Sequence, residues 1–127
     1  MDVDPAAAGA VDYPQMFRRM IVRSAEAALA SVDPQAAELQ EDVRERSLYA
    51  LSMALKVPEA WPASRELLVS VSQPLGRQGA LDKSLSLLEQ GIAVAEAQSD
   101  YSALGQMYVQ LGWCHWRLGQ LDQAQDH

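Results

Sequence analysis

The side chains that could support nucleophilic or metal chemistry are few, and two of them are neighbours. Cys114 and His115 are adjacent, and the other histidine is the last residue, His127. A cysteine and a histidine can act as nucleophile and base. Adjacent residues of a helix point about 100° apart, however, so these two cannot form a dyad alone. We expect Cys114 to be a small buried residue, and we predict no metal site because no second histidine lies four residues from His115.

Carboxylates are plentiful, but their spacing does not predict an active site. Glu89, Glu96 and Asp100 are expected to lie on solvated helix faces. Asp82 and Asp122 each follow a predicted turn, where a helix N-terminus favours negative charge. Catalysis needs a convergent set of groups, and none is visible. The sequence therefore predicts neither an enzyme nor a cofactor.

The charge balance argues against a nucleic-acid partner. The chain has 10 Lys and Arg against 17 Asp and Glu, for a net charge of −7. Phosphate neutralisation needs clustered basic residues, and such a cluster occurs only at Arg18, Arg19 and Arg23. We expect these three to form a solvated helix face. No apolar stretch approaches the roughly 20 residues that span a bilayer, so no membrane partner is predicted.

Length and composition favour one small helical domain. The 127 residues include no Thr and no Asn, and helix-forming residues dominate. A single Cys excludes an internal disulfide and fits a reducing compartment. Residues 1–12 are acidic and small and lack the basic start of a signal peptide. We therefore expect a disordered leader over 1–12 and a cytoplasmic location.

Apolar residues at three- and four-residue steps predict six helices. They run over about 14–32, 34–57, 62–79, 81–98 and 101–118, with a sixth from near 120 that is cut off at 127. Asp33 and Pro34 are expected to end the first helix and start the second. Pro74 should kink the third helix or end it early. Gly79 and Gly119 should end the third and fifth helices. The first two helices would form a hairpin over residues 13–57.

A repeat of 40 residues lies in the second half of the chain. GALDKSLSLLEQG begins at Gly79 and GQLDQAQDH at Gly119, and both read Gly-x-Leu-Asp-x-small. This pattern resembles the tetratricopeptide repeat, whose unit is two helices with large and small residues at fixed positions. In one unit, the positions of the family pattern are taken by Tyr108, Leu111, Gly112, His115, Leu121 and Ala124. In the earlier unit, they are taken by Leu68, Val71, Ser72, Leu75, Leu81, Ser84, Leu88 and Gly91.

The resemblance implies an all-α, tetratricopeptide-like stack of helical hairpins with about six helices. It covers residues 58–127, with the last unit truncated, and the 13–57 hairpin would be a degenerate repeat. In this alignment His115 departs from the family pattern but takes its aromatic slot, which implies a core position. The long unit is similar to repeats in sensor arms of bacterial regulators and signalling NTPases. The chain has no Gly-rich phosphate loop, so it carries no nucleotide-binding module itself.

The resemblance also implies a concave groove that binds a protein partner. Its lining residues would be Gln106, Val109, Trp113, Trp116 and Arg117, with Val69, Gln73 and Arg77 from the earlier unit. Trp113 and Trp116 are three residues apart and would share a helix face with Arg117, which makes a plausible hot spot. The alternative is that both tryptophans pack against the next repeat or a second copy of the chain. The family's Lys and Asn carboxylate clamp is excluded, because the chain has no Asn.

Three hypotheses about function follow. The first is a non-catalytic protein–protein interaction scaffold that binds a peptide or helix in the groove. The second is the amino-terminal part, or a fragment, of a larger regulator whose repeats act as a sensor or self-association arm. If the chain is instead complete, its uncovered carboxyl-terminal end is expected to promote self-association. The third is a helical enzyme with a site built from residues such as Glu38, Glu41 and His115.

Overall fold

The computed structural model describes residues 12–126, and it describes side chains as far as Asp122. The expected leader over 1–12 lies outside these residues except for Asp12, and His127 lies outside them as well. The described chain is all-α and contains no strand. Its elements are α2 (Tyr13–Ser31), α3 (Glu41–Ala54), the 3₁₀ turn η1 (Pro58–Ala60), α4 (Trp61–Arg77), α5 (Leu81–Ala97) and α6 (Tyr101–Asp126).

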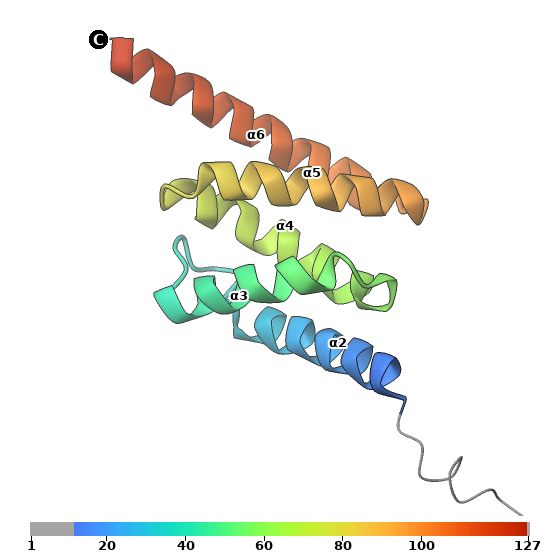
Figure 1. The fold of residues 1–127 in the computed structure, drawn as a ribbon. Coiled ribbons are helices and arrows are strands. Elements are labelled where there is room, and N and C mark those ends of the chain that lie inside the picture. Colours follow the sequence, from blue (N-terminus) through green and yellow to red (C-terminus); the bar gives the residue numbers. More distant parts are fainter. Residues whose placement is uncertain (1–11, 127) are drawn as a thin grey trace, which may run out of the picture.

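The helices form a stack in which each one contacts the next (Figure 1). The central helix α4 also contacts α2 on one side and α6 on the other. The last four helices begin at Glu41, Trp61, Leu81 and Tyr101, so each begins 20 residues after the one before. Two such steps equal the 40-residue offset of the sequence repeat. No helix among the described residues is both long and apolar enough to cross a membrane.

Five α-helices are present in the described chain, and the prediction of six is wrong. The predicted fifth and sixth helices are one continuous helix, α6, which passes through Gly119. A glycine within a helix costs only about 1 kcal/mol relative to alanine, which does not by itself force an end. At Gly79 the chain turns because Leu81 is buried, with 5% of its surface exposed. Leu121, its counterpart after Gly119, is 42% exposed and has no such packing to draw the chain back.

The turn at Gly79 is a helix end of the predicted kind. Gly79 has φ +84°, a left-handed conformation that glycine adopts without steric cost. The N–H of Ala80 donates to the Leu75 carbonyl at 2.9 Å, which makes this a Schellman motif. The same bond recurs 20 residues later, where the N–H of Asp100 donates to the Ala95 carbonyl at 2.9 Å. There Ser99, with φ +54°, takes the left-handed position.

The predicted helix start at Pro34 is wrong, and α4 does not end early at Pro74. Residues from Pro34 onward form a loop, and α3 begins only at Glu41, because the Asp33 carboxylate accepts a bond from the N–H of Gln35 and closes a turn. Pro74 lies inside α4, which continues to Arg77. A proline there loses one helix hydrogen bond at a cost of about 3 kcal/mol. Burial of the surrounding turns of α4 against the core offsets that cost.

Small residues in the core let α4 and α5 approach closely. Ser72 and Ser84 are fully buried, and the Ser84 hydroxyl donates to the Ser72 carbonyl at 2.8 Å. A Cβ atom on Gly91 would collide with the side chain of Leu68. The two helices approach closely at these three positions, and fully buried leucines such as Leu88 pack around the contact. This packing fixes α5 on α4 and provides the base on which α6 rests.

Candidate binding groove

A groove of about 240 Å³ lies where α4, α6 and the α2–α3 loop meet. We call it the α4–α6 groove and define it by its lining residues, which are Asp33, Pro34, Ala36, Val69, Ser70, Gln73, Pro74, Arg77 and Gln110. Three residues that the sequence assigned to a groove are among them, namely Val69, Gln73 and Arg77. They lie at four-residue steps and therefore share one face of α4.

Arg77 is the basic residue of this groove, and Asp33 is its acidic one. The side chain of Arg77 is exposed, and its Nη2 donates to Gln73 Oε1 at 3.2 Å. The guanidinium carbon lies 5.7 Å from the centre of the Trp113 ring, within cation–π range. Among the described side chains, no carboxylate lies within ion-pair distance of Arg77. The guanidinium is thus oriented by an amide and an aromatic ring, with hydrogen-bond donors left for a partner.

Trp113 is held beside the groove by close contact with α4. It is half-buried, and a Cβ atom on Gly76 would lie 2.7 Å from its Cζ3 atom. Only glycine at position 76 therefore leaves room for the ring. A bond between the Ser72 hydroxyl and Gln110 Oε1, at 3.0 Å, connects the same two helices. Together these contacts set the position of the α6 wall of the groove.

The other predicted residues of α6 do not line the groove. Gln106, Val109 and Trp116 are exposed, and 59% of the Trp116 surface is free. Arg117 is half-buried. Trp113 and Trp116 thus have different surroundings, although they are three residues apart. The structure brings Val69, Gln73 and Arg77 together with Trp113, and it leaves Val109 and Trp116 on the free face of α6.

Asp33 and Gln110 are groove residues that sequence reasoning missed. Asp33 belongs to the segment that was expected to start a helix, so the sequence did not predict that its loop lines the groove. That loop is fixed by Gln78, whose side-chain Nε2 donates to the Leu39 carbonyl at 2.7 Å. Leu39 and Gln78 both precede the repeat that begins at Gly79, so no repeat pattern in the sequence points to this contact.

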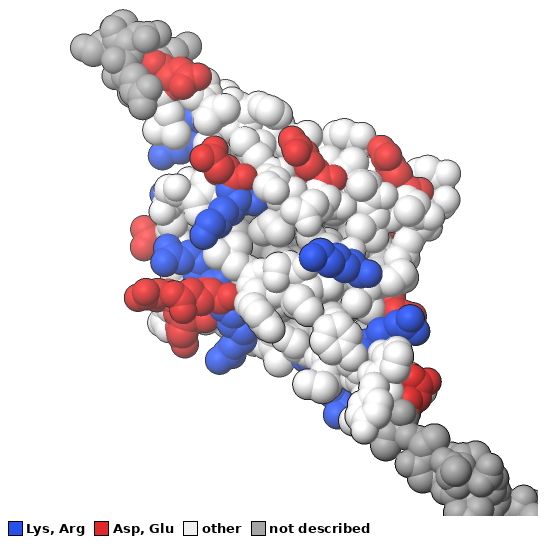
Figure 2. Space-filling model, in the orientation of Figure 1, with Lys and Arg blue, Asp and Glu red and all other residues white. Residues whose placement is uncertain are grey.

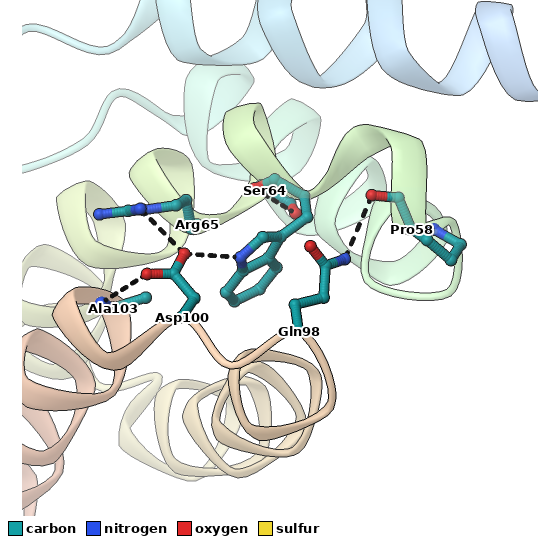
Figure 3. Close-up of polar contacts among 7 residues, drawn as sticks. Pro58, Ser64, Arg65, Gln98, Asp100 and Ala103 are labelled. Atoms are coloured by element: carbon teal, nitrogen blue, oxygen red, sulfur yellow. Dashed lines mark hydrogen bonds and ion pairs between the residues drawn. The ribbon is translucent and has the colours of Figure 1, made fainter.

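Asp100 joins α4 to α6 through one carboxylate (Figure 3). Oδ2 accepts from Trp61 Nε1 and from Arg65 Nη1, each at 2.9 Å, and Oδ1 accepts from the N–H of Ala103 at 3.1 Å. The hydrogen bond from Trp61 contributes most to lowering the pKa of Asp100, followed by that from Ala103. The expectation that Asp100 lies on a solvated face is therefore wrong, and its bond from the Ala103 N–H caps the N-terminus of α6. Asp100 holds α6, and hence Trp113, against α4.

Cys114 and His115 do not act together. Cys114 is buried, and burial raises the pKa of its thiol, opposed by a hydrogen bond with the Ser84 hydroxyl 3.6 Å away. His115 is exposed, so the expected core position is wrong. No helix covers this face of α6 in the described structure, and the aromatic slot therefore stays open. The described residues include no group of three or more His, Cys, Asp or Glu side chains able to hold a metal ion.

The arginine cluster of α2 lies on the surface, as expected. Arg18, Arg19 and Arg23 are exposed and line a hollow of about 630 Å³. Three carboxylates, from Asp12, Glu26 and Glu59, line the same hollow and balance their charge. The hollow is therefore not a basic site for phosphates. On the face shown in Figure 2, basic and acidic side chains are likewise intermixed.

Comparison of the chain with models of known protein families, with curated proteins and with solved structures found no match. The proposal of a function therefore rests on the geometry of the α4–α6 groove.

Proposed function

We propose that this chain is a non-catalytic protein-interaction module that holds a peptide or a helix in the α4–α6 groove. The observation that carries the proposal is Arg77, which is exposed in the groove and stacked on Trp113 without a carboxylate partner among the described side chains. Arg and Trp contribute disproportionately to binding energy at protein interfaces. Val69 offers apolar contact, and the amides of Gln73 and Gln110 can bond a peptide backbone.

The proposal includes a tetratricopeptide-like architecture. All eight positions that the earlier unit assigns to this pattern are buried, namely Leu68, Val71, Ser72, Leu75, Leu81, Ser84, Leu88 and Gly91. The regular helix starts, 20 residues apart, support the same interpretation. A cytoplasmic location belongs to the proposal as well, and it rests on the single cysteine of the sequence.

A displayed library of random peptides provides a test that does not require the natural partner. Peptides enriched on the immobilised chain are synthesised and titrated, with Trp fluorescence as the readout. We expect Arg77→Ala to weaken their binding by about 10-fold, a typical loss for an interface arginine. Arg23→Ala, an exposed arginine outside the groove, is the matched control and should bind as the unchanged chain does. Equal binding by the Arg77→Ala variant would show that the groove is not the site.

A further inference from the structure

The free side of α6 carries a continuous uncharged surface. Seven residues at three- and four-residue steps form one helix face, and each of them is exposed. We call this surface the α6 face; it consists of Gly105, Tyr108, Val109, Gly112, His115, Trp116 and Gly119. More than half of the surface of each large aromatic side chain is exposed, 52% for Tyr108 and 59% for Trp116. Residues that α6 buries, such as Met107 and Cys114, lie on its opposite side.

The α6 face is symmetric about its central residue, Gly112. Val109 and His115 lie three residues to either side of it. Tyr108 and Trp116 lie four residues away, and Gly105 and Gly119 lie seven away. An antiparallel helix with the same face, centred on the same residue, would therefore place aromatic against aromatic and glycine against glycine. A surface of this kind complements itself through a two-fold axis.

The three glycines leave a notch for a close helix contact. A Cβ atom built at position 105, 112 or 119 would meet no heavy atom within 4 Å, so none of these glycines is needed for the fold of one copy. Each still lowers the intrinsic helix propensity by about 1 kcal/mol relative to alanine. The large residues stand beside the notch, where they could pack against a helix that enters it. In α6, the charged residues with described side chains are Arg117 and Asp122, and neither belongs to the α6 face.

The matching surface of α4 shows that such a face accepts a helix. Tyr108, Gly112 and His115 follow Leu68, Ser72 and Leu75 by 40 residues. These three residues of α4 are fully buried in the core that α4 and α5 share, whereas the three residues of α6 are exposed. In the part of the chain that the structure describes, the surface of α6 thus has the position of a helix-covered surface, and no helix covers it (Figure 1).

We propose that a second copy of this chain covers the α6 face, with the two α6 helices antiparallel and crossing at Gly112. Tyr108 of each copy then packs against Trp116 of the other, and Val109 packs against His115 of the other. The contact runs from Gly105 to Gly119, about 21 Å at the helical rise. Because the α6 face points away from α4 and α5, the two stacks lie on opposite sides of the pair. This self-association goes beyond the proposed groove function and does not depend on it.

The mass of the full chain in solution is the first test. We expect a dimer by sedimentation equilibrium, and a monomer for Gly112→Glu, because two glutamates would meet on the two-fold axis. Gly112→Glu has open space in a single copy and is a better helix former, so the helical content by circular dichroism should not fall. Gln90→Glu adds the same charge on the exposed face of α5 and should remain dimeric. A monomeric unchanged chain, or a Gly112→Glu variant that stays dimeric, would overturn the proposal.

Engineered cysteines test the direction and register of the pair. Gly112→Cys should form a disulfide with itself between copies on mild oxidation, since the two positions face each other across the axis. Gly105→Cys and Gly119→Cys should each fail to cross-link alone and should cross-link when mixed. Cys114 is buried and serves as the unreactive background. Self-cross-linking at all three positions would show a parallel pair, and cross-linking at none would show another contact; either result would overturn the antiparallel arrangement.

Discussion

At the scale of single residues, Asp100 does more than cap a helix. Its carboxylate accepts hydrogen bonds from Trp61 and Arg65 of α4 and from the backbone of α6. One carboxylate therefore connects the two helices. The carboxylate rather than the neutral acid is the form that accepts all three donors. The pKa of Asp100 is accordingly lower in the folded chain than in the unfolded chain, with the Trp61 bond as the largest cause.

This shift predicts how acid affects the fold. A depressed folded-state pKa contributes stability that is fully present above the unfolded value, near pH 4, and that is lost as the pH falls through the lower folded value. We expect Asp100→Asn to unfold at a lower temperature than the unchanged chain at pH 7 and to lose less of its stability on acidification. Thermal unfolding followed by circular dichroism between neutral pH and pH 2 measures both effects.

Asp82→Asn is the matched control, because Asp82 is exposed in the first turn of α5 and is not bonded to another helix. It should change the melting temperature little. If Asp100→Asn and Asp82→Asn follow the same pH curve, the carboxylate of Asp100 does not join the helices in solution.

At the scale of elements, the α4–α5 pair depends on small residues at the helix contact. Gly91 is the clearest case, since a Cβ atom there would meet Leu68, which is fully buried. We expect Gly91→Ala to lower the free energy of unfolding by about 1–3 kcal/mol, the usual range for overpacking a core. Glu89→Ala, on the exposed side of the same helix, should stay within about 0.5 kcal/mol. Urea unfolding measures both, and equal stability of the two variants would contradict the close approach of α4 and α5.

Local signals predicted the elements well where packing agrees with them. The apolar pattern predicted a helix over 81–98, and α5 runs over Leu81–Ala97. The prediction that Gly79 ends α4 is confirmed. The helix ends there because the chain after Gly79 returns to the core. Gly119 carries the same local signal, but no buried residue follows it among the described side chains, and α6 continues. The repeat pattern placed Val69, Gln73 and Arg77 on one face of α4, where they line the α4–α6 groove. It did not find Asp33, because the loop of Asp33 is held by the distant contact between Gln78 and Leu39.

At the scale of the whole molecule, the stack leaves large apolar side chains exposed at both of its end helices. On α2 these are Tyr13, Met16, Phe17 and Met20, and on α6 they include Tyr101, Tyr108, Val109 and Trp116. Repeat proteins form continuous cores by stacking, and their end surfaces need a cover or a polar face. The α4–α6 groove and the exposed faces of the end helices are separate surfaces. We propose the groove for a peptide or a helix and the α6 face for a second copy of the chain.

The central claim is that a partner binds in the α4–α6 groove, and backbone amide shifts measure this most directly. A library-selected peptide is added to the isotope-labelled chain, and the residues whose signals move are mapped. We predict changes over residues 33–36 and 69–77, at Gln110 and at the Trp113 indole N–H. Changes confined to the arginine cluster of α2, or to the outer side of α5, would contradict the account.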